Sequence, residues 1–244
     1  ENPTDVGGNN IYDVIVQVSD GTLTDTQAIA VTVTDVNEAP VITSNGGGAT
    51  AALNVAENTT AVTTVTSTDV DAGATQTYTI SGGADAAKFT INSSTGVLSF
   101  VSAPNFENPT DVGGNNIYDV IVQVSDGTLT DTQAIAVTVT DVNEAPVITS
   151  NGGGATASVN VAENSTAVTT VTATDVDAGA TQTYSISGGA DAAKFTINSS
   201  TGVLSFVSAP NFESPTDVGG NNVYDVTVQV SDGTLTDTQA IAVT

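Results

Sequence analysis

The 244-residue sequence lacks cysteine, histidine, methionine and tryptophan altogether. Without thiol and imidazole side chains, the usual zinc, copper and iron–sulfur sites cannot be built. Neither cysteine nor histidine is therefore available as a nucleophile or general base, and only Lys88 and Lys194 are basic, so most catalytic arrangements cannot be assembled. We therefore expect no enzymatic activity.

Positive charge is nearly absent too. The chain has 27 acidic residues against 2 basic ones, for a formal net charge of -25 at pH 7. Such a chain repels nucleic acid and anionic membrane surfaces, so neither is expected as a partner. The sequence also has no apolar run of membrane-spanning length. Hard cations with oxygen ligands remain as the natural ligands.

A repeat of 106 residues organises the sequence. Residues 1–10 recur at 107–116 and, with Ser214 in place of an asparagine, at 213–222. Residues 39–138 and 145–244 align without gaps and differ at eight positions. A unit of this length suits one small all-β domain. We expect the last part of a repeat at 1–36, a complete repeat at 39–142 and a nearly complete one at 145–244.

Each copy contains seven strand-like segments bounded by Gly, Asn, Asp, Ser and Pro. In the first complete copy they are expected at about 40–43 with a continuation at 52–55, then at 61–68, 77–80, 89–91, 97–100, 117–125 and 129–140. Within 117–125, Tyr118, Val120, Val122 and Val124 alternate with more polar residues and should face the core. No segment indicates a helix. The pattern predicts an all-β chain of tandem seven-stranded, immunoglobulin-like Greek-key sandwiches.

Acidic and amide side chains gather in the turns. If the strands alternate in direction, counting them assigns each turn to one end of the sandwich. The set expected at the lower end of the first complete copy is Glu57, Asn105, Glu107, Asp141, Asn143 and Glu144. The set expected at the upper end is Asp69, Asp71 and Asp126, repeated in the next copy as Asp175, Asp177 and Asp232. The short linker 141–146 would bring the lower set of one copy to the upper set of the next.

So many carboxylates at one joint repel one another unless a cation neutralises them. Ca²⁺ accepts 6–8 oxygen ligands in flexible geometry, whereas Mg²⁺ resists such crowding, so Ca²⁺ is the expected cofactor. An earlier joint would use Glu1, Asp35, Asn37 and Glu38 with the first upper set, but it lacks counterparts of Glu57 and Asn105. The lower end of the last copy carries Glu163, Asn211 and Glu213. We expect tighter binding at the second, complete joint.

Together these motifs resemble the cadherin repeat, including the cadherin-like repeats of large bacterial surface proteins. Residues 56–58 (Ala-Glu-Asn) resemble its x-E-N motif, 69–71 its D-x-D, 105–107 its D-x-E, Asp126 its aspartate after the sixth strand, and 141–146 its D-x-N-D-N-x-P linker. Three positions depart from the pattern, namely Asn105, Glu144 and Ala145. The resemblance implies a cadherin-type sandwich with Ca²⁺ at the joints, in a number of two or three ions that the departures leave open.

The expected function is that of Ca²⁺-rigidified extender repeats, which hold a functional tip of an extracellular or cell-surface protein, such as a bacterial adhesin, away from the cell. Adjacent repeats of the same chain would be the main protein partners. Two alternatives remain open. The first is a binding module that adheres to other copies of itself or to polysaccharide, and the second is a repeat subunit of an extracellular filament. Asp111 is a secondary candidate ligand, whereas Asp85, Asp119 and Asp131 are expected to be solvent-exposed surface acids.

Overall fold

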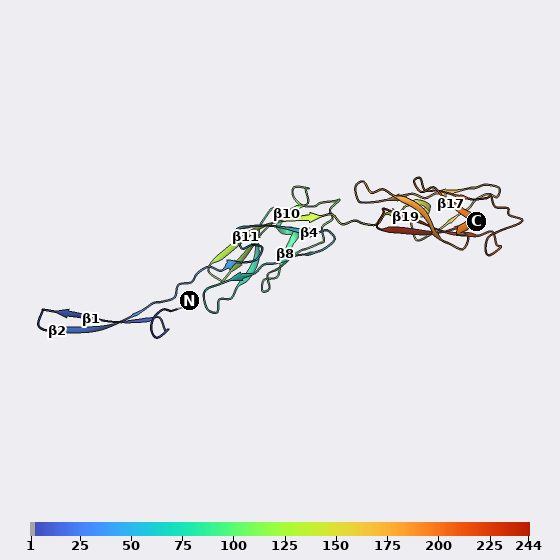
Figure 1. Ribbon diagram of the computed structural model, residues 1–244. Coiled ribbons are helices and arrows are strands. Elements are labelled where there is room, and N and C mark those ends of the chain that lie inside the picture. Colours follow the sequence, from blue (N-terminus) through green and yellow to red (C-terminus); the bar gives the residue numbers. More distant parts are fainter. Residues whose placement is uncertain (1–2) are drawn as a thin grey trace. The chain divides into compact units, whose positions relative to one another are not determined.

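The computed structural model describes residues 3–244 and divides into two compact units, Glu1–Asp141 and Val142–Thr244. The regular structure of the described residues consists of β-strands and three single-turn 3₁₀ helices, η1 (Ala86–Lys88), η2 (Ser150–Gly152) and η3 (Ala192–Lys194) (Figure 1). These short turns lie in loops, so the all-β prediction is confirmed with only this addition. Nowhere in residues 3–244 does a helix reach the length and apolarity needed to cross a membrane.

Two sheets and a short strand pair build the sandwich in the first unit. Strands β4 (Thr50–Ala56), β11 (Thr130–Thr140), β10 (Ile117–Ser125) and β7 (Thr77–Gly82) form one sheet in that order. Strands β5 (Ala61–Thr64), β9 (Val97–Phe100) and β8 (Phe89–Ile91) form the other, and β3 (Val41–Ile42) pairs with β6 (Ser67–Thr68). Strand β4 runs parallel to β11, whereas the remaining pairs are antiparallel. All seven predicted strands are therefore present.

The core follows the predicted alternation. Tyr118, Val120, Val122 and Val124 of β10 are each no more than 1% exposed, while Asp119 between them is exposed. The ring of Phe100 stacks on Phe89 at 4.6 Å between centroids and meets Tyr118 edge-on at 5.2 Å. Burial of these apolar side chains is the main favourable contribution to folding of the unit.

The second unit repeats this arrangement. Its first sheet contains β13 (Thr156–Val159), β20 (Thr236–Val243), β19 (Tyr224–Ser231) and β16 (Thr183–Gly188), in that order. Its second sheet contains β14 (Ala167–Thr170), β18 (Val203–Phe206) and β17 (Phe195–Ile197), and β12 (Val147–Ile148) pairs with β15 (Ala173–Thr174). Because the two copies differ at so few positions, most of the same side chains fill both cores, with Val228 and Val230 fully buried like their counterparts.

Before the first sandwich, strands β1 (Ile11–Ser19) and β2 (Thr24–Thr32) form a hairpin (Figure 1). Its pairing register reproduces that of β10 with β11, as Ile11 opposite Thr32 corresponds to Ile117 opposite Thr138. The same apolar face is nevertheless open, because Val16 is 44% exposed whereas its counterpart Val122 is fully buried. The hairpin therefore keeps its strand pairing while its core-forming side chains stay uncovered.

Two buried polar groups fix loops to the sheets. Gln133 of β11 has no exposed surface; its Nε2 donates to the carbonyl oxygen of Gly48 at 2.8 Å and its Oε1 accepts from Asn45 Nδ2 at 3.2 Å. Asp131 is half-buried rather than solvent-exposed, because its Oδ2 accepts a hydrogen bond from the backbone N–H of Ile42 at 2.8 Å. The expectation of a purely solvating role for Asp131 is thus wrong.

Candidate metal centre

Glu57 forms the centre of the lower-end cluster in the first unit. It follows β4 in a turn that Asn58 closes with a left-handed backbone conformation, φ 59°. The side chain is only 1% exposed, and its Oε2 accepts a hydrogen bond from the backbone N–H of Phe106 at 2.8 Å. The turn is tied to the last strand as well, since the Glu57 N–H donates to the Thr140 carbonyl at 3.0 Å.

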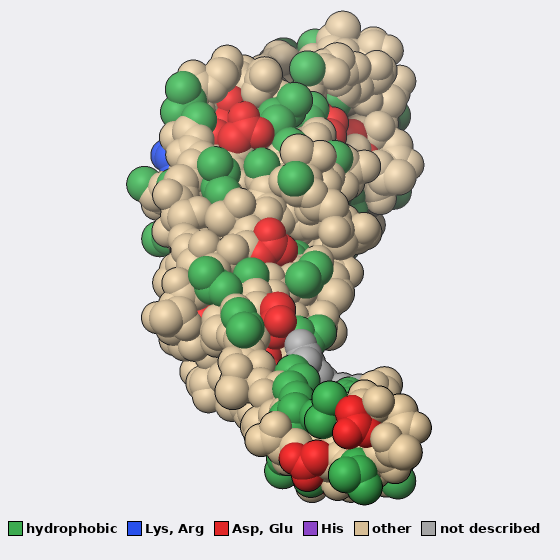
Figure 2. Space-filling view, turned by 90° about the vertical axis from the view of Figure 1, so that its left-hand side faces the viewer, with side chains coloured by type: hydrophobic (Ala, Val, Ile, Leu, Met, Phe, Trp, Pro, Cys, Tyr) green, Lys and Arg blue, Asp and Glu red, His purple; other side chains and the backbone are tan. Residues whose placement is uncertain are grey.

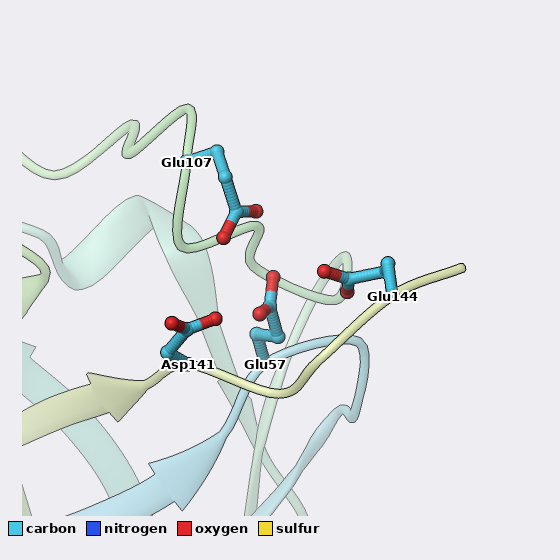
Figure 3. Close-up of side chains that lie close together, drawn as sticks. All are labelled: Glu57, Glu107, Asp141 and Glu144. Atoms are coloured by element: carbon cyan, nitrogen blue, oxygen red, sulfur yellow. The ribbon is translucent and has the colours of Figure 1, made fainter. Parts of the chain in front are cut away.

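Two further carboxylates of the same unit lie close to Glu57. Glu107 and Asp141 each bring a carboxylate oxygen within 4.8 Å of it and of each other. Figure 3 shows their side chains, together with Glu144, which follows Asp141 by three residues in the sequence. Carboxylates at this spacing repel one another. The three sequence-predicted lower-end acids of this unit are therefore brought together, in an arrangement that suits a cation.

At the upper end of the first unit, the central residue is Asp71. Its Oδ2 accepts from the backbone N–H of Glu38 at 2.9 Å, and its own N–H donates to Asp69 Oδ1 at 2.9 Å. Its Oδ1 is buried and has no hydrogen-bond partner within the described residues. A buried carboxylate oxygen without a donor costs free energy unless a cation binds it. Asp35 and Glu38 place carboxylate oxygens within 4.8 Å of Asp71 and of each other.

Asp126 lies beside this group at the turn after β10. Its Oδ1 accepts from the N–H groups of Leu129 at 2.7 Å and Thr128 at 2.6 Å, and its Oδ2 accepts from Asn37 Nδ2 at 2.7 Å. These hydrogen bonds, led by the one from Leu129, lower the pKa of Asp126 to about 2. The carboxylate is thus fixed in orientation and ionised at neutral pH.

The same contacts recur within the second unit. Asp177 Oδ2 accepts from the Glu144 N–H at 2.9 Å, and Asp177 Oδ1 is buried with no partner among residues 3–244. Asp177 also donates its N–H to Asp175 Oδ1 at 3.1 Å. Asp232 Oδ2 accepts from Asn143 Nδ2 at 2.8 Å, and hydrogen bonds from Thr234 and Leu235 lower the pKa of Asp232. The linker residues 143 and 144 are therefore bound to the upper end of the second unit.

Other predicted site residues are placed differently. Asn105 and Asn211 use their side-chain oxygens to accept N–H groups of residues 108 and 214, at 2.6 and 3.0 Å, so each closes a turn. Glu163 and Glu213 are exposed, although Glu163 Oε2 accepts from the Phe212 N–H at 3.1 Å. Glu1 lies outside the described residues.

Two acids outside the predicted clusters have structural roles that the sequence did not indicate. Asp85 is 3% exposed, which contradicts the expected surface position; its two oxygens accept from the N–H groups of Val112 at 2.8 Å and Asp119 at 2.9 Å. Asp111 is 7% exposed. Burial raises the pKa of Asp111, but hydrogen bonds from Asn115 and Asn116 outweigh it and lower the pKa overall. A glycine at 83 allows the close backbone approach that seats Asp85, since a Cβ there would collide with the backbone of Asp119.

The donor set fits Ca²⁺. All candidate ligand atoms are oxygens, most of them carboxylate, and one oxygen each of Asp71 and Asp177 is buried with no donor among residues 3–244. Hard oxygen donors in a crowded, flexible arrangement are the ligands of Ca²⁺ rather than of zinc or Mg²⁺. On the face drawn in Figure 2, acidic side chains lie scattered among uncharged polar and backbone atoms.

In sequence, the chain is similar to proteins that contain cadherin domains. Residues 157–244 match the model of the cadherin domain. The chain is 30% identical to human Protocadherin Fat 1 over 217 residues, which cover 86% of the chain and 4% of that much longer protein.

Solved structures agree at lower identity. The chain resembles human CDH23 EC21-23 with a TM-score of 0.59 and 20% identity, covering 96% of this chain and 74% of that one. For the Protocadherin gammaB7 EC3-6 cis-dimer structure, the TM-score is 0.54 and the identity 23%, covering 96% of this chain and 60% of that one. At such identities the likeness shows the fold. The chain therefore folds as tandem cadherin-like domains, and residues 157–244 match the cadherin domain itself.

Proposed function

We propose that the chain is a Ca²⁺-stiffened extender and that Ca²⁺ binds where one repeat meets the next. The observation that carries this proposal is the attachment of residues 143 and 144, at the start of the second unit, to acids of that unit. Asn143 and Glu144 bind Asp232 and Asp177 through direct hydrogen bonds at 2.8 and 2.9 Å. These bonds hold the backbone of residues 143 and 144 against the second unit and so set the point from which the Glu144 side chain extends.

The ligands of the second joint come from both sides of the linker. Glu57, Glu107 and Asp141 form a cluster at the end of the first unit, and Asp175, Asp177 and Asp232 gather at the start of the second. We assign Glu144 to the same site, with two or three ions sharing bridging carboxylates. Bound Ca²⁺ would remove the repulsion among these groups and hold the two units in a fixed orientation. Other divalent ions of smaller size would fit less well.

The location that suits such sites is extracellular, because Ca²⁺ concentrations there are high enough to fill sites of millimolar affinity. Near-identical repeats contribute length, whereas a specific adhesive function needs only one well-formed site. We therefore assign the repeats to the stalk of a surface protein, such as a bacterial adhesin, with the adhesive specificity elsewhere. Residues 1–36 correspond in sequence to the last two strands of a repeat of the same kind.

Small-angle X-ray scattering of the 244-residue chain tests the proposal. When Ca²⁺ is added to chelator-treated protein, we expect the maximum dimension of the particle to increase. The distribution of interatomic distances obtained from the scattering should become narrower. Mg²⁺ at the same concentration controls for ionic strength and general charge screening. Identical scattering with chelator and with millimolar Ca²⁺ would contradict the extender function. Concentration-dependent growth of the particle would instead support the filament or homophilic alternatives.

A further inference from the structure

The peptide units next to Phe106 are held from two sides. The N–H of Phe106 donates to Glu57 Oε2 at 2.8 Å, and the Phe106 carbonyl oxygen accepts from Asn116 Nδ2 at 2.8 Å. Phe106 directly precedes Glu107 in the chain. These two bonds therefore fix the backbone from which the Glu107 carboxylate extends toward Glu57 (Figure 3).

Asn116 is itself rigidly placed. Its backbone is left-handed with φ 62°, its N–H donates to Asp111 Oδ1 at 3.0 Å, and its carbonyl oxygen accepts from the Val139 N–H at 2.8 Å. Asp85 holds the same loop through Val112. A continuous set of hydrogen bonds thus runs from Asp85 through the loop to Asn116, Phe106 and Glu57.

The side-chain amide of Asn116 is not needed to close its own loop. The identical loop before β1 closes in the same way, because Asp5 accepts the N–H groups of Gly7, Asn9 and Asn10 at 2.9–3.0 Å. The conformation of the loop therefore comes from the aspartate and the glycines. What the Asn116 amide adds is the bond to the ligand-bearing segment.

We propose that Asn116 is a positioning residue for the lower-end Ca²⁺ ligands: it holds the 105–107 segment so that Glu107 and Glu57 present their carboxylates to one ion. This inference rests on the proposed Ca²⁺ function. Hydrogen-bond partners that orient metal ligands typically contribute 10–100-fold to metal affinity, although they touch no metal. Asn222 has the equivalent role in the second unit, where its Nδ2 donates to the Phe212 carbonyl at 3.0 Å.

The decisive variant is Asn116→Gly, because glycine adopts the left-handed conformation without strain and removes only the side-chain amide. Isothermal titration of the full 244-residue chain with CaCl₂ should show the tightest class of sites weakened at least about tenfold. Melting measured in chelator should change little. Asn10→Gly is the matched control, since it makes the same substitution in the same loop, and the 244 residues include no counterpart of Phe106 or Glu57 on which this amide could act; the affinity of the tightest class of sites should equal that of the wild type.

A second variant, Asn116→Asp, separates positioning from charge. It keeps the side-chain size but replaces the NH₂ donor by an acceptor opposite the Phe106 carbonyl. Added negative charge alone would tighten Ca²⁺ binding, whereas loss of the positioning bond weakens it. Tighter or unchanged affinity in both variants would overturn the inference while leaving the Ca²⁺ function intact. A wild-type chain that binds no Ca²⁺ would refute the proposed function itself.

Discussion

The backbone N–H of Glu144 donates a hydrogen bond to Asp177 Oδ2 over 2.9 Å, and the N–H of Glu38 makes the equivalent bond to Asp71 Oδ2 over the same distance. In both cases the linker glutamate is attached to the aspartate of the repeat that follows. The other oxygen of each aspartate is buried without a donor in the described part of the chain. One oxygen thus binds the linker and the other is free to bind a cation.

Substitution of Asp177 should affect Ca²⁺ binding far more than folding. We expect Asp177→Asn to weaken binding at the second joint, because it removes one negative charge while the amide oxygen can still accept the Glu144 N–H. The melting temperature in chelator should stay close to that of the wild type, and the Ca²⁺-induced increase in melting temperature should shrink. Calorimetric scans with and without Ca²⁺ check both points. Equal losses in the two conditions would show that Asp177 serves the fold and not the ion.

A charged side chain placed in the core should, in contrast, affect folding and not only Ca²⁺ binding. Val228→Asp places an unpaired carboxylate at a fully buried position, which costs several kcal/mol against a total stability of about 5–15 kcal/mol. We expect the second unit to unfold at room temperature with or without Ca²⁺. Val16→Asp, the same substitution on the open face of the β1–β2 hairpin, is the control and should leave both units folded. Circular dichroism distinguishes the outcomes.

Loss of the Gln133 amide should destabilise the first unit by about 1–3 kcal/mol. Gln133→Ala removes a fully buried side chain and leaves the carbonyl oxygen of Gly48 without its 2.8 Å donor. Chemical denaturation of the variant should show a lower midpoint for one of two transitions. Gln27→Ala, at the exposed counterpart in β2, serves as the comparison. A midpoint shift as large for Gln27 as for Gln133 would mean that the buried network contributes nothing.

The two joints of this 244-residue polypeptide should bind Ca²⁺ unequally. The second joint includes the cluster of Glu57, Glu107 and Asp141, whereas the first has no counterpart of Glu57. Titration calorimetry should therefore resolve a tight and a weak class of sites, and Glu57→Gln should weaken only the tight class. Asp225→Asn, which neutralises an exposed acid on β19, controls for net charge. A single class of equivalent sites would refute this prediction.

The strands, and the end of the sandwich at which each acidic residue lies, were predictable because both follow from the order of strands and turns along the sequence. Alternation in 117–125 identified the buried face of β10, and counting strands placed Glu57, Glu107 and Asp141 together. The role of Asp85 was not predictable, because an aspartate in a Gly- and Ala-rich loop looks like a solvated turn. Only the fold brings it to the N–H groups of Val112 and Asp119, far along the chain. Asn116 was missed for the same reason.

The hairpin of β1 and β2 shows that this strand pair reaches its native register with its apolar face uncovered. Such a pair closes only a short loop and can form within microseconds, ahead of contacts between distant segments. In a chain of near-identical repeats, the hairpin formed by the last two strands of one repeat can then pair during folding with the first five strands of a neighbouring repeat. Correct assembly depends on chain connectivity, which gives the hairpin that directly follows a set of strands the higher effective concentration. Domain-swapped intermediates between neighbouring repeats are the expected error of such an array during refolding.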